Sequence, residues 1–223
     1  MKQKLKTLAK KYSHAIWVLY FAFYLPWFNF LNVYTPTRPE ATEMYCKLDD
    51  LIPFNEWFVI PYFLWFAYIA VGYVFLLLNN REDYYRMCAF LYIGMTTCLI
   101  IYTLFPNYQD LRVDYETLGR SNLLTEAIRW LQSSDSAYEV FPSIHCLNSI
   151  GMNIALWKNK WCQKHPWLIV FVTVLSVSIC LSTVFVKQHS ILDLFGAVAL
   201  SVPLYLIAYV IPWSKIIKRK AES

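Results

Sequence analysis

Charged residues are scarce in this sequence. They make up 16% of its 223 residues, against 58% hydrophobic residues, and the mean hydropathy is +0.37. Soluble domains usually carry about 25% charged residues. A large soluble core could absorb part of this difference, but not apolar runs of about 20 residues, the length that crosses a bilayer. The sequence contains such runs, which favours an integral membrane protein.

Cysteine pairs with the spacing of metal or redox sites are also missing. The six cysteines are scattered, and none forms a CxxC pair. Four of them fall inside apolar runs, where cysteine behaves as a small hydrophobic residue. The other two, Cys46 and Cys162, fall in loops that we expect on opposite sides of the membrane. The sequence therefore predicts neither a zinc site nor a disulfide framework.

Six apolar runs approach membrane-spanning length, at residues 14–33, 57–78, 84–105, 141–157, 166–186 and 191–213. The fourth run is short, and polar residues interrupt its beginning, so its start is the least defined boundary. We expect residues 1–223 to form one all-α membrane domain, a bundle of six transmembrane helices. Two long outer loops, 34–56 and 106–140, would cover the end of the bundle that carries the site.

Basic residues are distributed unevenly over the loops. If the N-terminus is cytoplasmic, fourteen of the twenty Lys and Arg residues lie on the inner side and six on the outer side. Cytoplasmic loops of membrane proteins carry such an excess. We therefore expect both termini in the cytoplasm and the site facing the periplasm of a bacterial inner membrane, or the lumen or exterior in a eukaryote. The net charge of +5 then requires no nucleic-acid partner.

The second outer loop contains a candidate amphipathic helix, because Leu123, Leu124, Ile128 and Leu131 recur near a 3.6-residue period. Such a helix could lie at the membrane interface and shape an opening for lipid. It could equally pack on the outer ends of the transmembrane helices. The sequence leaves both interpretations open.

Three polar clusters fall at the same predicted outer boundary, although they are far apart in the sequence. They are QDLR, FPSIHC and FVKQHSILD, with the candidate residues Arg112, Ser143, His145, Lys187, His189 and Asp193. Ionisable groups at membrane depth are costly and tend to mark pathways or sites. The coincidence therefore predicts a functional site at the outer ends of the helices.

These residue types suit phosphate chemistry. Arg112 offers a bidentate fork and Lys187 a point charge, and Ser143 with nearby backbone N–H groups adds neutral donors if a helix begins there. His189 and Asp193 are spaced i, i+4, so on a helix the carboxylate could orient the imidazole for nucleophilic attack. His145 would then be free to protonate a leaving oxygen.

Two of the clusters resemble signature motifs of the type 2 phosphatidic acid phosphatase superfamily, whose patterns are KxxxxxxRP, PSGH and SRxxxxxHxxxD. PSIH at 142–145 is similar to the second motif, with Ile144 in place of glycine. STVFVKQHSILD at 182–193 is similar to the third, with Thr183 in place of arginine. The first motif departs more, because Val113 follows Arg112 and Phe105 stands where the family has lysine.

The resemblance implies a lipid phosphatase that is independent of metals and other cofactors. His189 would form a phosphohistidine, Asp193 would hold it and His145 would protonate the leaving group. Arg112, Lys187, Ser143 and Thr183 would bind the phosphate oxygens, with Lys187 restoring one missing cation. Hydrolysis of a phosphatidate or polyprenyl pyrophosphate is the first expectation.

Two alternatives remain. The KQH sequence, with IPF in the first outer loop, resembles the branch of inositol-phosphoceramide synthase-like enzymes, which transfer phospholipid headgroups to an alcohol. The altered first motif also leaves open a non-catalytic anion-binding protein or transporter. Binding alone has no need for an oriented His–Asp pair, which favours catalysis. The sequence does not indicate an oligomeric state.

Overall fold

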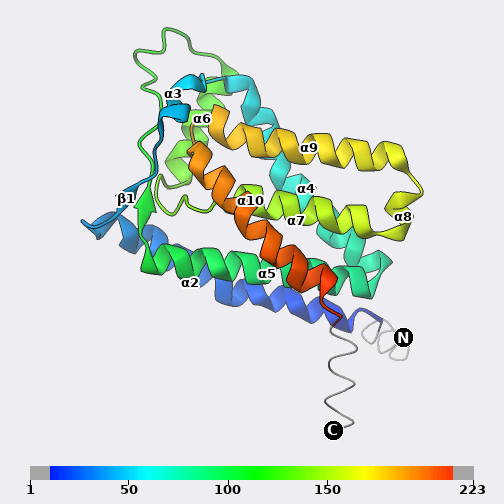
Figure 1. Cartoon of the computed structure of the whole chain (residues 1–223). Coiled ribbons are helices and arrows are strands. Elements are labelled where there is room, and N and C mark those ends of the chain that lie inside the picture. The colour runs from blue at the N-terminus through cyan, green and yellow to red at the C-terminus, as the bar shows by residue number, and fades with distance from the viewer. Residues whose placement is uncertain (1–10, 213–223) are drawn as a thin grey trace, which may run out of the picture.

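The computed structural model describes residues 11–212, and these form a bundle of helices with a small cap at one end (Figure 1). The long helices are α2 (Phe21–Tyr34, preceded by a 3-10 helix at Ser13–Tyr20), α4 (Val59–Asn79), α5 (Arg81–Leu104), α7 (Ile144–Lys158), α9 (Pro166–Phe185) and α10 (Ile191–Tyr205, continued by a π-helical turn at Leu206–Val210). The short elements are β1 (Thr42–Glu43), α3 (Lys47–Leu51), β2 (Asn107–Tyr108), α6 (Leu123–Ser134) and α8 (Lys160–Gln163), with 3-10 turns at Thr35–Thr37 and Glu56–Phe58.

Within residues 11–212, five helical segments are long and apolar enough to cross a membrane: Ser13–Thr37, Glu56–Asn79, Arg81–Leu104, Pro166–Phe185 and Ile191–Val210. They coincide with five of the six apolar runs and indicate a multi-pass membrane protein. The fourth run gives α7, whose 15 residues span only about 22 Å at 1.5 Å per residue. A count of six transmembrane helices therefore stays a prediction, although α7 lies inside the bundle.

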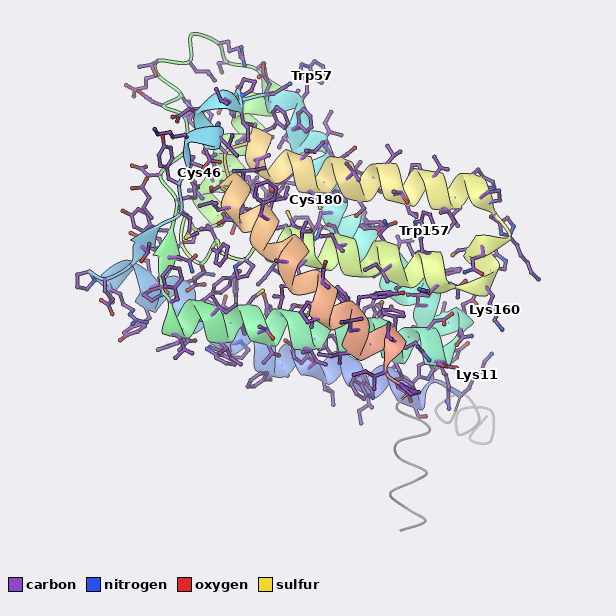
Figure 2. The ribbon with its side chains drawn as sticks, viewed as in Figure 1. Lys11, Cys46, Trp57, Trp157, Lys160 and Cys180 are labelled. Atoms are coloured by element: carbon purple, nitrogen blue, oxygen red, sulfur yellow. The ribbon has the colours of Figure 1, made fainter. Side chains whose placement is uncertain are left out.

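Some of the terminal residues on which the predicted orientation and the sixth run depend lie outside the described residues. These are the N-terminal Lys2, Lys4, Lys6 and Lys10, the C-terminal Lys215, Lys218, Arg219 and Lys220, and the end of the sixth run at Trp213. The structure describes other basic residues that belong to the same predicted side. Figure 2 places Lys11 and Lys160 at the end of the bundle opposite to Cys46 and α3.

Helix α7 is the central element. It packs against α5 on one side and α9 on another, and it also contacts α4 and α10. The buried Gly151 of α7 lies directly against Phe90 and Leu91 of α5, where a β-carbon would collide with their side chains. Close packing at this glycine fixes the depth of α7 in the bundle. It therefore sets the position of His145 at the N-terminal end of α7.

The two outer loops pair with each other over the end of the bundle. β1 runs parallel to β2, with Thr42 opposite Asn107. The Asn107 side-chain oxygen accepts hydrogen bonds from the backbone N–H groups of Val140 and Phe141, both at 2.8 Å. One buried asparagine thus ties the first outer loop to the segment that leads into α7.

Helix α6 packs on the outer ends of the transmembrane helices, which was one of the two interpretations of its amphipathic pattern. Ile128 and Leu131 are buried in a cluster with Val59, Tyr62 and Val186. Leu123 is 85% exposed, so the apolar stripe is buried only in part. The helix forms a roof over the region where the polar clusters meet.

Candidate active site

The turn at residues 186–190 joins α9 to α10 and carries the third polar cluster. The backbone N–H groups of Gln188 and His189 both donate to the carbonyl oxygen of Thr183 at 3.0 Å. Lys187 has a φ of 58°, a left-handed conformation that is uncommon for residues with a side chain. The left-handed residue reverses the chain within one turn, so α10 can begin directly after His189.

The outer loops hold this turn from several sides. Asn55 N–H donates to the carbonyl of Phe185 at 3.0 Å, and the Gln132 side chain donates to the carbonyl of Val186 at 3.3 Å. The Gln109 side chain donates to the carbonyl of Lys187 at 3.3 Å. Each contact joins residues more than 50 positions apart, so the geometry of the turn depends on the assembled fold.

His189 and Asp193 form the predicted pair. Nδ1 of His189 lies 3.0 Å from Oδ2 of Asp193, and the side chains are only 8% and 0% exposed. The same carboxylate oxygen accepts the N–H of Ser190 at 3.0 Å, while the Ser190 hydroxyl caps the helix by accepting from Leu192 N–H. With the proton on Nδ1 held by the carboxylate, Nε2 has a free lone pair.

The surroundings of His189 favour its protonated form. Burial by itself lowers the pKa of the imidazole, but the hydrogen bond to Asp193 and the negative charge of that carboxylate outweigh it, so the pKa lies above its usual value. A carboxylate partner also fixes the ring in one tautomer. The arrangement can therefore stabilise positive charge on His189 when a bond forms at Nε2.

His145 lies next to His189. Ser143 caps α7 by accepting the Cys146 N–H, which puts His145 in the first turn of that helix, and the two imidazole centroids are 5.9 Å apart. Nε2 of His145 lies 3.4 Å from the Tyr62 hydroxyl, which donates to Oδ2 of Asp135 at 3.1 Å. Two histidines from different helices thus share one site.

Both histidines line a cavity of about 550 Å³. Its walls come from α2, α4, α5, α6 and α7 and from the segment between α6 and α7. Nine of the lining residues are aromatic, namely Tyr24, Phe28, Tyr62, Phe63, Trp65, Phe66, Tyr102, Trp130 and Tyr138. A cavity of this size and character fits part of a lipid, because ligand pockets of about 300–1,000 Å³ are commonly apolar with a few polar groups.

Ser143 and Thr183, the predicted neutral phosphate ligands, are fully buried and are not among the residues that line this cavity. The Ser143 hydroxyl is the cap of α7, and its backbone N–H donates to the carbonyl of Asp193 at 3.1 Å. The Thr183 hydroxyl donates to the carbonyl of Cys180 at 2.8 Å. In this arrangement both residues position the helices that carry the histidines.

Arg112 and Lys187, the predicted cationic ligands, lie nearby but also do not line the cavity. The Arg112 guanidinium donates to the carbonyls of Gln132 and Asp135, at 2.8 and 2.6 Å. Nζ of Lys187 donates to the carbonyl of Asp49 at 2.9 Å. Burial lowers the pKa of both side chains, in Lys187 despite the nearby charges of Asp49 and Asp50.

Sequence reasoning missed Asp49, which is 2% exposed. Its carboxylate accepts the Ser190 hydroxyl at 2.7 Å and the Ile191 N–H at 2.8 Å, and it also accepts the Cys46 N–H at 2.9 Å. The residue therefore joins the first outer loop to the start of α10. No local signal in the sequence marks it, because its partners on α10 are more than 140 positions away.

Replacing Asp49 with asparagine should weaken the turn that carries His189. The amide nitrogen of asparagine would face a donor group from which the carboxylate now accepts a hydrogen bond, and that bond would be lost. Losing a hydrogen bond to a charged group costs about 1.5–3 kcal/mol, so the melting temperature in detergent should fall by about 4 °C or more. Misplacement of the histidine should lower turnover by about tenfold to 100-fold. Asp50→Asn is the matched control, since Asp50 is the exposed neighbour; equal behaviour of the two variants would contradict the assignment.

Comparison with protein families gives one match, the family model of the PAP2 superfamily over residues 118–217. No curated protein and no solved structure matches the chain. The matched segment contains α6, α7, α9 and α10, and with them both histidines and Asp193, whereas Arg112 lies outside it. The resemblance drawn from the motifs is therefore confirmed: residues 118–217 match the PAP2 superfamily, whose members are phosphatases or phosphotransferases that act on phosphate esters.

Proposed function

We propose that this chain is a membrane enzyme that cleaves a lipid phosphate ester through a phosphohistidine on His189. The observation that carries the proposal is the buried His189–Asp193 hydrogen bond beside His145 and a lipid-sized cavity. An oriented histidine with a free Nε2 is a nucleophile, whereas a site that only binds anions needs no such pair. The same observation argues against the non-catalytic alternative.

The reaction has two steps. Nε2 of His189 attacks phosphorus, and a bond from nitrogen to phosphorus forms as the bond from phosphorus to the leaving oxygen breaks. His145 gives its proton to that oxygen, and Asp193 stabilises the positive charge on His189. Water then attacks phosphorus, His145 accepts a proton from it, and the bond to nitrogen breaks. The proposal routes no step through a metal.

Positive charge near the phosphate oxygens would stabilise the transition state. In this proposal Arg112 and Lys187 exchange their carbonyl partners for phosphate oxygens when substrate is bound. Nε of Arg112 is buried without a hydrogen-bond partner, which supports such an exchange. Ser143 contributes through the start of α7, where backbone N–H groups favour an anion, and Thr183 contributes by supporting His189.

Orientation in the membrane is part of the proposal. The site would face the periplasm of a bacterial inner membrane, or the lumen or exterior in a eukaryote, with both termini in the cytoplasm. The uneven distribution of Lys and Arg supports this orientation. The lipid would reach the cavity from the outer leaflet.

Two versions of the activity follow from the same chemistry. In the first, the substrate is a phosphatidate or a polyprenyl pyrophosphate and water completes the reaction. In the second, the substrate is a phospholipid and its phosphorylated headgroup passes to an alcohol. The presence of Asp135 and Glu139 in the cavity wall favours the second version, because carboxylates repel a doubly charged phosphomonoester.

Purified full-length protein in detergent with a chelator tests the proposal. It would be supplied with phosphatidate, a polyprenyl pyrophosphate, and a phospholipid with diacylglycerol as acceptor. Release of phosphate identifies a phosphatase, and a new headgroup on the acceptor identifies a transferase. The proposal fails if no lipid is converted, if His189→Gln is as active as the parent, or if turnover depends entirely on a divalent ion.

A further inference from the structure

We propose that the lipid donor carries a positively charged ammonium headgroup, of choline or ethanolamine type, which binds in the cavity beside His145 and His189. This inference rests on the proposed function and names its substrate class. Four independent features of the cavity support it: its charge, its unpaired acceptors, its aromatic walls and the engagement of the neighbouring cations elsewhere.

Two carboxyl groups and two histidines stand in the cavity wall, and the carboxyl groups are the possible partners of a cationic ligand. Asp135 and Glu139 line the cavity, and none of the lining residues within 11–212 is a lysine or an arginine. Asp135 is held beside His145 by hydrogen bonds from Tyr62 at 3.1 Å and Gln188 at 3.2 Å. A ligand group with positive charge would meet complementary charge at these two carboxylates.

Among the lining side chains of the described residues, two acceptor oxygens and one donor, Nε1 of Trp65, are buried without a hydrogen-bond partner. Glu139 is 5% exposed; one of its oxygens accepts the Thr35 hydroxyl at 2.8 Å, and Oε2 has no partner. Oε1 of Gln188 is also without a partner. Buried acceptors without donors are costly, so a ligand that supplies positive charge or N–H donors would relieve the cost.

Burial raises the pKa of Glu139 to about 7. A cation beside a carboxyl group favours its ionised form. The backbone of Glu139 is in the left-handed region, with φ at 62°, and such conformations often accompany ligand sites. An ammonium group in the cavity would therefore stabilise the charge that burial now disfavours.

The aromatic walls suit the same group. Trp65 and Trp130, with tyrosines and phenylalanines, surround the cavity. Ammonium groups bind over aromatic faces, with tryptophan the strongest partner, and quaternary ammonium ligands are commonly held in this way. A bare phosphate gains nothing from these surfaces.

Arg112 and Lys187 do not line the cavity and do not pair with its two carboxylates. Both outer nitrogens of the Arg112 guanidinium donate to carbonyls, and Nζ of Lys187 is bound to the carbonyl of Asp49. When these two cations turn to the phosphate, as the proposed function requires, Asp135 and Glu139 remain without a cationic side chain and can serve a charged headgroup.

The reaction on such a donor is balanced. Nε2 of His189 forms a bond to phosphorus, the bond from phosphorus to the glycerol oxygen breaks, and His145 protonates that oxygen to release diacylglycerol. Water or an alcohol then attacks phosphorus, His145 takes its proton, and the bond from phosphorus to His189 breaks. Water yields the free phosphorylated amino alcohol, and an alcohol yields a new phosphodiester of the acceptor with the amino alcohol.

Four short-chain lipids with the same tails test the inference: phosphatidylcholine, phosphatidylethanolamine, phosphatidylinositol and phosphatidate. We expect kcat/KM for the two ammonium lipids to exceed that for the other two by about tenfold or more, as a desolvated cation–aromatic contact provides. Glu139→Gln should remove about tenfold of this preference, measured as the ratio of kcat/KM for the choline lipid to kcat/KM for phosphatidate. Glu126→Gln, an exposed carboxylate of α6, is the matched control and should change nothing.

Different failures have different meanings. Faster cleavage of phosphatidate or of the inositol lipid would overturn the inference and leave the proposed function standing. If no lipid is cleaved, the proposed function fails, and calorimetric binding of the same lipids to His189→Gln protein decides the inference: equal affinity for the choline lipid and phosphatidate overturns it. Asp135→Asn, measured in the same way, replaces Glu139→Gln if that variant does not fold.

Discussion

Replacing His189 with glutamine should reduce lipid turnover by about 10⁴-fold or more. Loss of a covalent nucleophile removes the reaction path itself, which is why such variants retain only residual activity. Glutamine keeps a polar side chain of similar length, and the His189 ring is largely buried, so the fold should survive. Turnover of the lipid that the parent cleaves best provides the measurement.

His165→Gln is the matched control for this prediction. His165 precedes α9 at the other end of that helix, where its Nδ1 contacts the carbonyl of Trp161, and its replacement should leave turnover unchanged. A lipid donor that carries a labelled phosphorus should also transfer the label transiently to the parent protein, as detected after the reaction is stopped without acid. The His189→Gln protein should remain unlabelled. Label that persists in the variant would assign the nucleophile to another residue.

Asp193→Asn should lower turnover by about 10³- to 10⁴-fold. The asparagine can present an N–H to the imidazole and so favour the tautomer with its proton on Nε2, which leaves no lone pair for attack. The carboxylate also stabilises the charge that His189 gains when it bonds to phosphorus. The substrate affinity should change much less than the maximal rate, because Asp193 is fully buried and does not line the cavity.

The pH profile separates this role from a purely structural one. His189 attacks in its neutral form, so activity falls as pH drops through its pKa. Burial lowers the pKa of His189, but the hydrogen bond and charge of Asp193 raise it by more, so it lies above the usual value. Removal of the carboxylate should therefore lower the pKa and shift the acid limb of the residual activity to lower pH. An unmoved acid limb, with lower activity and a lower melting temperature, would mean that Asp193 only supports the fold.

The apolar runs determined where the long helices lie. The backbone polar groups of a single run of about 20 apolar residues can all form hydrogen bonds within the bilayer only if the run is a helix. The i, i+4 spacing of His189 and Asp193 predicted that the two would meet on a helix. They do meet, but His189 lies in the turn before the Ser190 cap, so the geometry of the turn and cap brings them together. The sequence left the start of the fourth run least defined, and the structure puts it at the Ser143 cap, with His145 in the first turn of α7. Predictions of this kind depend on short-range patterns of residues, and such patterns can be read directly from the sequence.

Residue roles that depend on side-chain direction could not be predicted in the same way. The motif resemblance put Ser143 and Thr183 among the phosphate ligands, but their hydroxyls bond to the backbone of their own helices. Lys187 follows its left-handed backbone toward Asp49 instead of toward the cavity. Motif spacing fixes the order of residues along the chain but not which neighbour satisfies each donor.

The sequence by itself determined the helical membrane character, since it follows from composition, and it predicted the shared depth of three polar clusters and the His–Asp pair. Only the tertiary structure decided what surrounds the two histidines. Asp49 reaches α10 from the first outer loop, and Asp135 and Glu139 reach the cavity from the second. Such contacts join residues far apart in the chain, and the close packing of α7 against α5 and α9, which no local pattern encodes, brings them together.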